Sequence, residues 1–148
     1  MMKLTFALLF ALAITRLHAQ EYVTPIVDYC WGDTIAFLKV PSNFKEHNWH
    51  YGEGTMTTLT YPDSSRIFLH IGGNMTVPWL WKDDYLVYES QMIGEVEIRN
   101  GRKKGTQLFW REVVFSGMMN IGYEGITKQQ IKAYDQSIDS FVLYKKKK

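Results

Sequence analysis

Turn signals constrain the fold of this chain more than any other sequence feature, because each joins two segments that suit β-strands. Pro62 presets the first torsion of a tight turn, and Asp63 is able to bond the backbone that follows it. The flanking segments, 55–61 and 66–71, are rich in threonine, β-branched and aromatic residues, as strands are. We therefore expect an antiparallel hairpin over residues 55–71.

A second hairpin is expected further along the chain. Residues 95–99 alternate charged and apolar side chains, which is typical of a strand with one wet face. The run 100–105 begins with Asn-Gly, a hairpin turn signal, and leads into a second strand segment at 106–115. Turn residues also bound apolar segments at 34–40 and near 118–123, and these are predicted to be strands.

Helix signals are fewer and lie mainly at the C-terminal end. Thr127 and Gln130 have the spacing of a capping box. Apolar residues then recur every three or four positions, which gives a helix with one apolar face: Ile131, Tyr134, Ile138, Phe141 and Val142. A short helix is also predicted over 85–92, with Asp83 or Asp84 capping its first turn.

These segments predict an α+β fold. The apolar face of the C-terminal helix must be buried, and the simplest partner is one face of the preceding sheet. We expect a mainly antiparallel sheet of about five or six strands with the C-terminal amphipathic helix packed on one face. Residues 43–54, rich in His, Asn and Gly, are expected to form a loop outside that sheet.

The first residues have the pattern of a secretory signal peptide. Lys3 precedes the apolar stretch 4–14, and a small residue, Ala19, closes the segment, so 1–19 is predicted to be removed after Ala19. The apolar stretch is about half of the roughly 20 residues that a membrane-spanning helix needs, and no second long apolar run follows. We therefore expect a periplasmic or secreted protein with no transmembrane segment, built as one domain over 20–144.

Charge argues against a nucleic-acid partner. Without Lys3 and Arg16 the chain has 15 basic and 15 acidic residues, and four of the basic ones form the tail 145–148. The basic pI therefore comes from the two ends rather than from a basic face on the domain. Cys30 is the single cysteine, so no disulfide within the chain stabilises the exported domain.

The order of the predicted elements resembles a known fold. Paired strands around the turn 61–64, a middle helix, a long hairpin and a closing helix that ends in Ser-Ile-Asp-Ser-Phe, 137–141, are similar to the Mog1/PsbP-like fold. The resemblance spans about 37–142 by element order and implies a non-enzymatic binding module, with no site residues carried over. The leader ending, 18–20, resembles exported proteins of the Bacteroidetes.

Four aromatic residues form the candidate partner-binding surface. Trp49 and Tyr51 lie in one predicted loop, and Trp79 and Trp81 flank a leucine after a proline. In an extended segment Trp79 and Trp81 point to the same side, which suits stacking on a sugar ring or anchoring a partner protein. The same rings are also suited to a core position in a small domain.

A metal site is the alternative. His47 and His50 would share one face of a helix, and a zinc site needs a third ligand, which Glu53 or His70 is able to offer. This pattern would suit a small exported metal-dependent hydrolase. No nucleophile elbow or glycine-rich phosphate loop is present, so no catalytic residue and no cofactor is predicted.

The sequence thus favours an exported, soluble, non-enzymatic binding or accessory module of the bacterial envelope, of the inhibitor, immunity or assembly type. Its expected partner is an envelope protein or glycan. The hydrolase using the His47/His50 segment is the alternative, and a structural envelope component held on anionic lipid by the lysine tail is a third hypothesis. Neither the oligomeric state nor a role for Cys30 is indicated by any pattern.

Overall fold

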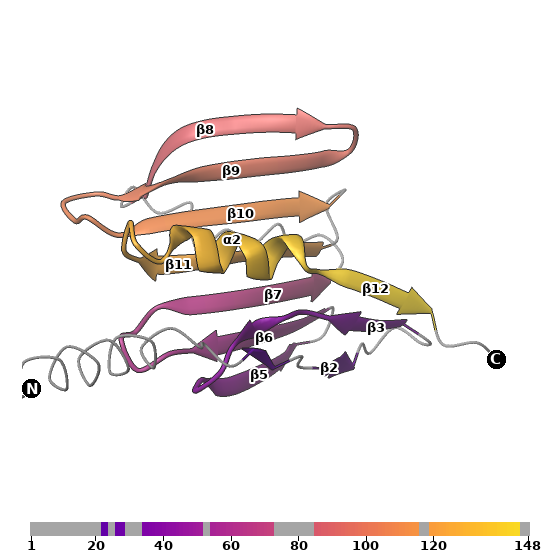
Figure 1. Ribbon diagram of the computed structural model, residues 1–148. Helices are drawn as coiled ribbons and strands as arrows, with labels where there is room; N and C mark the ends of the chain where they lie inside the picture. The colour runs from indigo at the N-terminus through magenta and orange to yellow at the C-terminus, as the bar shows by residue number, and fades with distance from the viewer. Residues whose placement is uncertain are drawn as a thin grey trace, which may run out of the picture.

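The computed structural model describes residues 22–23, 26–28, 34–51, 54–72, 85–115 and 119–145. Its main element is an antiparallel sheet of seven strands (Figure 1). In spatial order these are β5 (Lys45–Tyr51), β6 (Gly54–Thr60), β7 (Arg66–Gly72), β11 (Met119–Ile126), β10 (Phe109–Phe115), β9 (Val96–Lys103) and β8 (Tyr85–Ile93).

Shorter elements accompany this sheet. A three-stranded sheet has the order β12 (Val142–Lys145), β3 (Thr34–Phe37) and β2 (Ile26–Asp28), and β1 (Tyr22–Val23) pairs with β4 (Val40–Pro41). The helix of the described residues, α2, covers Ile131–Asp139 and lies in front of β10 and β11 in Figure 1. Within the described residues, no helix is long and apolar enough to cross a membrane.

The large sheet consists of two meanders joined side by side. Strands β5, β6 and β7 follow one another, as do β8, β9, β10 and β11, and the two groups meet where β7 pairs with β11. All of these pairings are antiparallel. Strands β5 and β8 are therefore the two edges of the sheet.

Alternation along the strands divides the sheet into two faces. The face toward α2, here called the helix face, carries the main core, which includes Leu69 and Ile121. The ring of Tyr134 on α2 packs edge-on against Tyr61 and Tyr123, with centroids 5.5 and 5.8 Å away. The opposite side, here called the far face, carries the alternate residues of the same strands.

The first hairpin and the C-terminal helix are confirmed, and they contact each other; the helix begins after Gln130, which makes no side-chain capping bond to the helix, so the predicted capping box at Thr127 is wrong. Asp63 accepts a hydrogen bond from the Ser65 backbone amide at 3.0 Å, as the turn signal predicts. The Gln130 side chain donates to Asp63 at 2.7 Å, and its oxygen accepts from the Thr127 backbone amide at 2.8 Å. The Ser65 hydroxyl lies 2.7 Å from the Tyr134 hydroxyl, so the turn is fixed to the helix.

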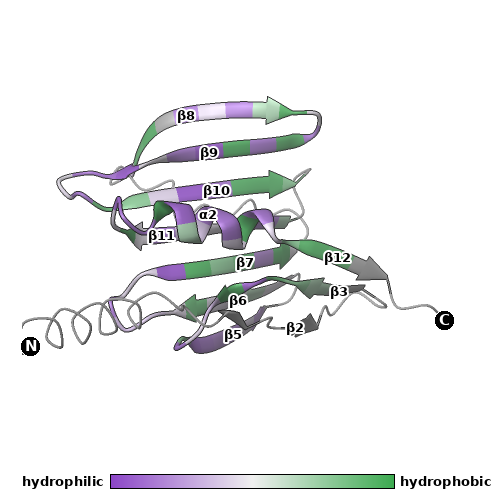
Figure 2. Cartoon of the chain, in the orientation of Figure 1, coloured by the Kyte–Doolittle hydropathy of each residue, from purple (hydrophilic) through white to green (hydrophobic). Residues whose placement is uncertain are grey.

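The loop predicted over 43–54 is wrong, because residues 45–51 form edge strand β5. The backbone of this segment pairs with β6 along its whole length. Side chains support that pairing, since the Thr57 hydroxyl donates to Asn48 at 2.6 Å. Polar residues suit this strand because it lies at the edge of the sheet, and Figure 2 shows β5 as more hydrophilic than β7.

The helix predicted over 85–92 is also wrong, because these residues lie in strand β8. The register of β8 on β9 shifts between Val87 and Glu89. Such a bulge inserts one extra residue, so the alternation of side chains between the two faces shifts by one position after it. Residues 85–88 are all apolar or aromatic, so no alternation marks the first part of this strand.

The remaining differences concern boundaries and size. The second hairpin is confirmed, but β9 continues through Gly101, and the turn comes at Gly105, where φ is +73°. Gly101 is needed for close approach instead, since a Cβ there would lie 1.7 Å from the Leu86 carbonyl oxygen. The antiparallel sheet has seven strands rather than five or six. The strand predicted over 34–40 is divided between β3 and β4. The helix ends before Val142, which belongs to β12.

Candidate functional site

An open groove lies on the far face over strands β5, β6 and β7. Its volume is about 440 Å³, and we call it the Trp49 groove; it is lined by His47, Trp49, Met56, Thr58, Thr60 and Arg66. Each lining residue takes the far-face position in its strand, because the antiparallel register aligns alternate residues of the three neighbours. The groove is therefore made entirely by sheet residues, which hold its shape.

Trp49 is the most unusual residue of this groove. Its side chain is 61% exposed, although tryptophan is one of the residues that gain most from burial. It lies on the edge strand directly opposite Met56 of β6. An exposed indole beside a groove is the kind of surface on which a flat or apolar ligand face stacks.

Thr58 adds an unsatisfied polar group to the groove wall. The residue is 6% exposed, and among the described residues its hydroxyl has no hydrogen-bond partner. Its neighbour Thr57 points to the other face and donates to Asn48 at 2.6 Å. A buried hydroxyl without a partner costs about 1–3 kcal/mol, so Thr58 is a local source of instability that a ligand hydroxyl would relieve.

Charge is balanced where the groove meets strand β11. The Arg66 guanidinium forms an ion pair with Glu124, and the Tyr85 hydroxyl donates to the same carboxylate at 2.5 Å. Glu124 is largely buried while Arg66 is partly exposed. The positive charge of Arg66 is therefore compensated within the protein.

A row of buried polar side chains crosses the far face beside the groove. Glu112 on β10 accepts a hydrogen bond from Asn120 on β11 at 2.6 Å, and Asn120 lies opposite His70 on β7. Burial raises the pKa of Glu112, which is 2% exposed and whose second oxygen lies 4.0 Å from Arg99. Burial lowers the pKa of His70, which is 1% exposed, although a hydrogen bond with Asn120 opposes that shift.

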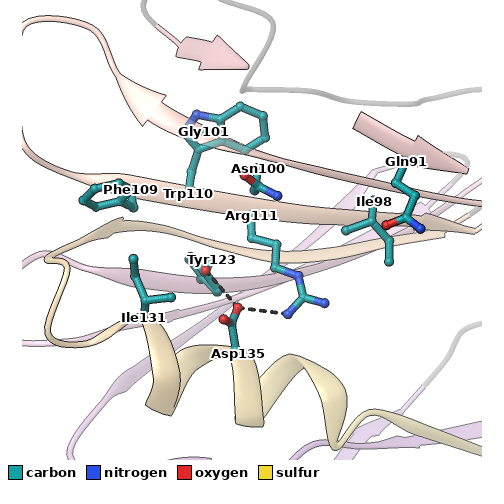
Figure 3. Close-up of a pocket in the computed structure, with 10 residues that line it drawn as sticks. All are labelled: Gln91, Ile98, Asn100, Gly101, Phe109, Trp110, Arg111, Tyr123, Ile131 and Asp135. Carbon is teal, nitrogen blue, oxygen red and sulfur yellow. Dashed lines mark hydrogen bonds and ion pairs between the residues drawn. The ribbon is translucent and has the colours of Figure 1, made fainter. Parts of the chain in front are cut away.

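A second cavity, of about 360 Å³, lies on the helix face between α2 and strands β9 to β11 (Figure 3). Apolar side chains such as Ile98 and Ile131 line it together with polar ones. Figure 3 shows Arg111 and Tyr123 reaching from the sheet toward Asp135 on the helix. Concave sites that combine apolar walls with a few converging polar groups are common ligand sites, so this cavity is a second candidate site.

The polar groups of that cavity bind one another. Arg111 donates to Asp135 at 2.9 Å and to Asp139 at 3.1 Å, and the Tyr123 hydroxyl donates to Asp135 at 3.0 Å. Burial tends to lower the pKa of Arg111, but Asp135 and Asp139 outweigh that effect and raise it. Burial and the carboxylate of Asp135 also raise the pKa of Tyr123. This cluster fixes the helix to the sheet, and its hydrogen-bonding capacity is largely used in doing so.

The proposed metal ligands are not brought together. His47 lines the far-face groove, whereas His50 lies on the helix face, 3.3 Å from the Thr55 hydroxyl. A spacing of three residues shares a face on a helix but opposes faces on a strand. His70 is on β7, beyond β6, and Glu53 lies outside the described residues. Within the described residues, no three His, Cys, Asp or Glu side chains gather where they would hold a metal ion.

The predicted aromatic surface is described only in part. Trp49 is exposed, as a partner-binding residue must be. Tyr51 belongs to β5, but its side chain is not described, and Trp79 and Trp81 lie outside the described residues. Their role in binding stays a prediction.

Sequence reasoning missed most of the groove. Thr58 and Met56 are ordinary residues of a strand rich in threonine, and no local pattern marks them. Arg66 follows a turn and resembles any surface arginine. Alternation puts residues 56, 58 and 60 on one side of a strand. The loop predicted over 43–54, however, gives no indication that β5 lies beside them.

Comparisons with family models, with curated proteins and with solved structures gave no match to this chain. The resemblance to the Mog1/PsbP-like fold therefore remains a prediction from element order.

Proposed function

We propose that this protein is an exported, soluble, non-enzymatic binding module of the bacterial envelope, and that the Trp49 groove is its ligand surface. The observation that carries the proposal is the 61% exposure of Trp49 beside a groove made by three neighbouring strands. Leaving an indole in water forgoes about 1.5–3 kcal/mol of the burial energy typical of large apolar side chains. A ligand that covers the ring recovers part of that energy.

The surroundings of the groove favour a binding role. The Arg66, Glu124 and Tyr85 side chains hold one another through an ion pair and a hydrogen bond. Strands on a continuous sheet fix the positions of Trp49 and Thr58 before any ligand arrives. A surface that is ordered in advance loses little conformational entropy on binding, and affinity rises accordingly.

The export part of the proposal rests on the leader. A positive residue, an apolar stretch and a small residue at position 19 make up the pattern. Expression in a bacterium, followed by fractionation and N-terminal sequencing, tests it. A periplasmic or secreted protein that begins at Gln20 supports export, and a cytoplasmic protein that still begins at Met1 contradicts it.

Binding is tested by retention on a bacterial envelope fraction. The full chain, Trp49→Ala and a matched control, Met92→Ala, are each incubated with the fraction and washed. Met92 is 62% exposed on the other edge strand, so its loss removes a similar amount of exposed apolar surface. Retention of the parent and Met92→Ala with release of Trp49→Ala supports the groove. Equal retention of all three proteins rejects it.

A further inference from the structure

We infer that the ligand of the Trp49 groove is a neutral saccharide, an inference that rests on the proposed function. Three features of the groove carry it: an exposed aromatic ring, a threonine hydroxyl that has no partner among the described residues, and a compensated charge.

The aromatic ring suits one face of a sugar ring. A pyranose presents C–H bonds on its face and hydroxyl groups around its edge, so it covers an indole with apolar surface while its rim stays polar. Trp49 offers that indole at the edge strand, with the Met56 side chain opposite it. A purely apolar ligand would also cover the ring, but it would leave the polar residues of the groove without partners.

Two of those polar residues are threonines, whose hydroxyl groups suit the hydroxyl groups around the edge of a sugar ring. Thr58 and Thr60 lie on the same side of β6 and both line the groove. Among the described residues, the Thr58 hydroxyl has no hydrogen-bond partner. The oxygen is buried in the unbound protein, so contact with a ligand requires rotation about the Cα–Cβ bond to another staggered position. A sugar hydroxyl both donates and accepts, so it satisfies a threonine hydroxyl in either orientation.

Charge separates a neutral sugar from an acidic one. The cation of the groove, Arg66, is paired with the carboxylate of Glu124. An acidic ligand that approached the guanidinium would meet that carboxylate as well, and the two negative charges would repel each other. A neutral hydroxyl group near the guanidinium meets no such repulsion. Because the groove lies at an edge of the sheet, a longer glycan is able to continue past β5.

The inference is tested by calorimetric titration of the full chain with defined oligomers. The neutral probes are chitohexaose, cellohexaose, mannohexaose and maltohexaose; the acidic probe is an oligogalacturonate, and the apolar probe is a tryptophan-rich peptide. For a neutral probe we expect Trp49→Ala to weaken binding by about ten-fold and Thr58→Val by about five-fold. Met92→Ala should bind like the parent, and circular dichroism confirms the fold of each variant.

Binding of at least one neutral oligomer with this pattern supports the inference. Stronger binding of the acidic oligomer or of the peptide, with the same dependence on Trp49, overturns the saccharide assignment but leaves the groove as the ligand surface. If no neutral oligomer binds while retention on the envelope still depends on Trp49, the assignment is likewise overturned and the proposed function stands. If no neutral oligomer binds and retention on the envelope does not depend on Trp49, both the saccharide assignment and the proposed function are overturned.

Discussion

Two adjacent threonines on β6 should respond in opposite ways to the same substitution. Thr57 and Thr58 are 3% and 6% exposed, and their side chains point to opposite faces of one strand. The Thr57 hydroxyl donates to Asn48 at 2.6 Å, whereas among the described residues the Thr58 hydroxyl has no partner. Valine has the shape of threonine and suits a strand, so the substitution removes only the hydroxyl.

The expected magnitudes follow from the hydrogen bonds. Thr57→Val loses one hydrogen bond to a side chain that water reaches, which should lower the free energy of unfolding by about 1 kcal/mol. Thr58→Val removes a buried hydroxyl that folding leaves unsatisfied, so it should raise the free energy of unfolding by about 1 kcal/mol. For a domain of this size each change corresponds to about 3 °C in the melting temperature, in opposite directions.

Thermal and urea unfolding of the parent and both variants, followed by circular dichroism, measure this contrast. The slope of the urea transition should stay unchanged, because the exposed area does not change. A Thr58→Val variant that is destabilised as much as Thr57→Val would refute the reasoning. It would mean that the Thr58 hydroxyl makes a hydrogen bond in the folded protein, and the argument for a ligand hydroxyl at that position would fail with it.

Three further perturbations test the fold. Gly122→Ala should lower the free energy of unfolding by about 3 kcal/mol, because the added Cβ would lie 2.3 Å from a carbonyl oxygen of the next strand. Gly125→Ala has room for the Cβ but a φ of +74°, so it should lower the free energy of unfolding by about 1 kcal/mol. Urea unfolding of both variants measures the difference. Burial lowers the pKa of His70 from 6.5, so the folded state binds fewer protons than the unfolded state. The free energy of unfolding of the parent should therefore fall, relative to that of His70→Gln, as the pH falls below about 6.5. Equal pH profiles of the two proteins would contradict this. Burial raises the pKa of Tyr134 from 10.0 to about 12, so above pH 10 the folded state keeps a proton that the unfolded state loses. The free energy of unfolding should therefore fall above about pH 10, and it should fall less steeply in Tyr134→Phe.

The parts of the fold that depend on local chemistry were predictable from the sequence. The turn at Pro62 and Asp63 requires only a few neighbouring residues, and the contact from the Ser65 amide to Asp63 is as expected. The C-terminal helix was predictable for the same reason, because its apolar spacing lies within a few turns.

The errors occur where distant strands decide the local structure. Residues 45–51 have weak strand character, and pairing with β6 makes them a strand. In β8 residues 85–88 are all apolar or aromatic, so alternation does not identify the strand, and its pairing with β9 decides the structure. The order of strands in the sheet, with β7 beside β11, also follows from long-range packing rather than from any local motif.

The candidate site shows the same division. Trp49 was predictable as a candidate binding residue because its side chain is large and amphipathic wherever it lies. The separation of His47 and His50 was not, since it depends on whether the segment is a strand or a helix. Thr58 was least accessible to prediction, because both its burial and its lack of a partner depend on how β5, β6 and β7 align.

The most direct test of the Trp49 groove is a chemical-shift map of the isotope-labelled full chain titrated with soluble fragments of a bacterial envelope. The account predicts that the changes concentrate on the Trp49 indole N–H and on the backbone amides of His47, Met56 and Thr58, which share the groove. Changes confined to edge strand β8 or to the cavity beneath α2, or no changes at saturating fragment, would contradict it.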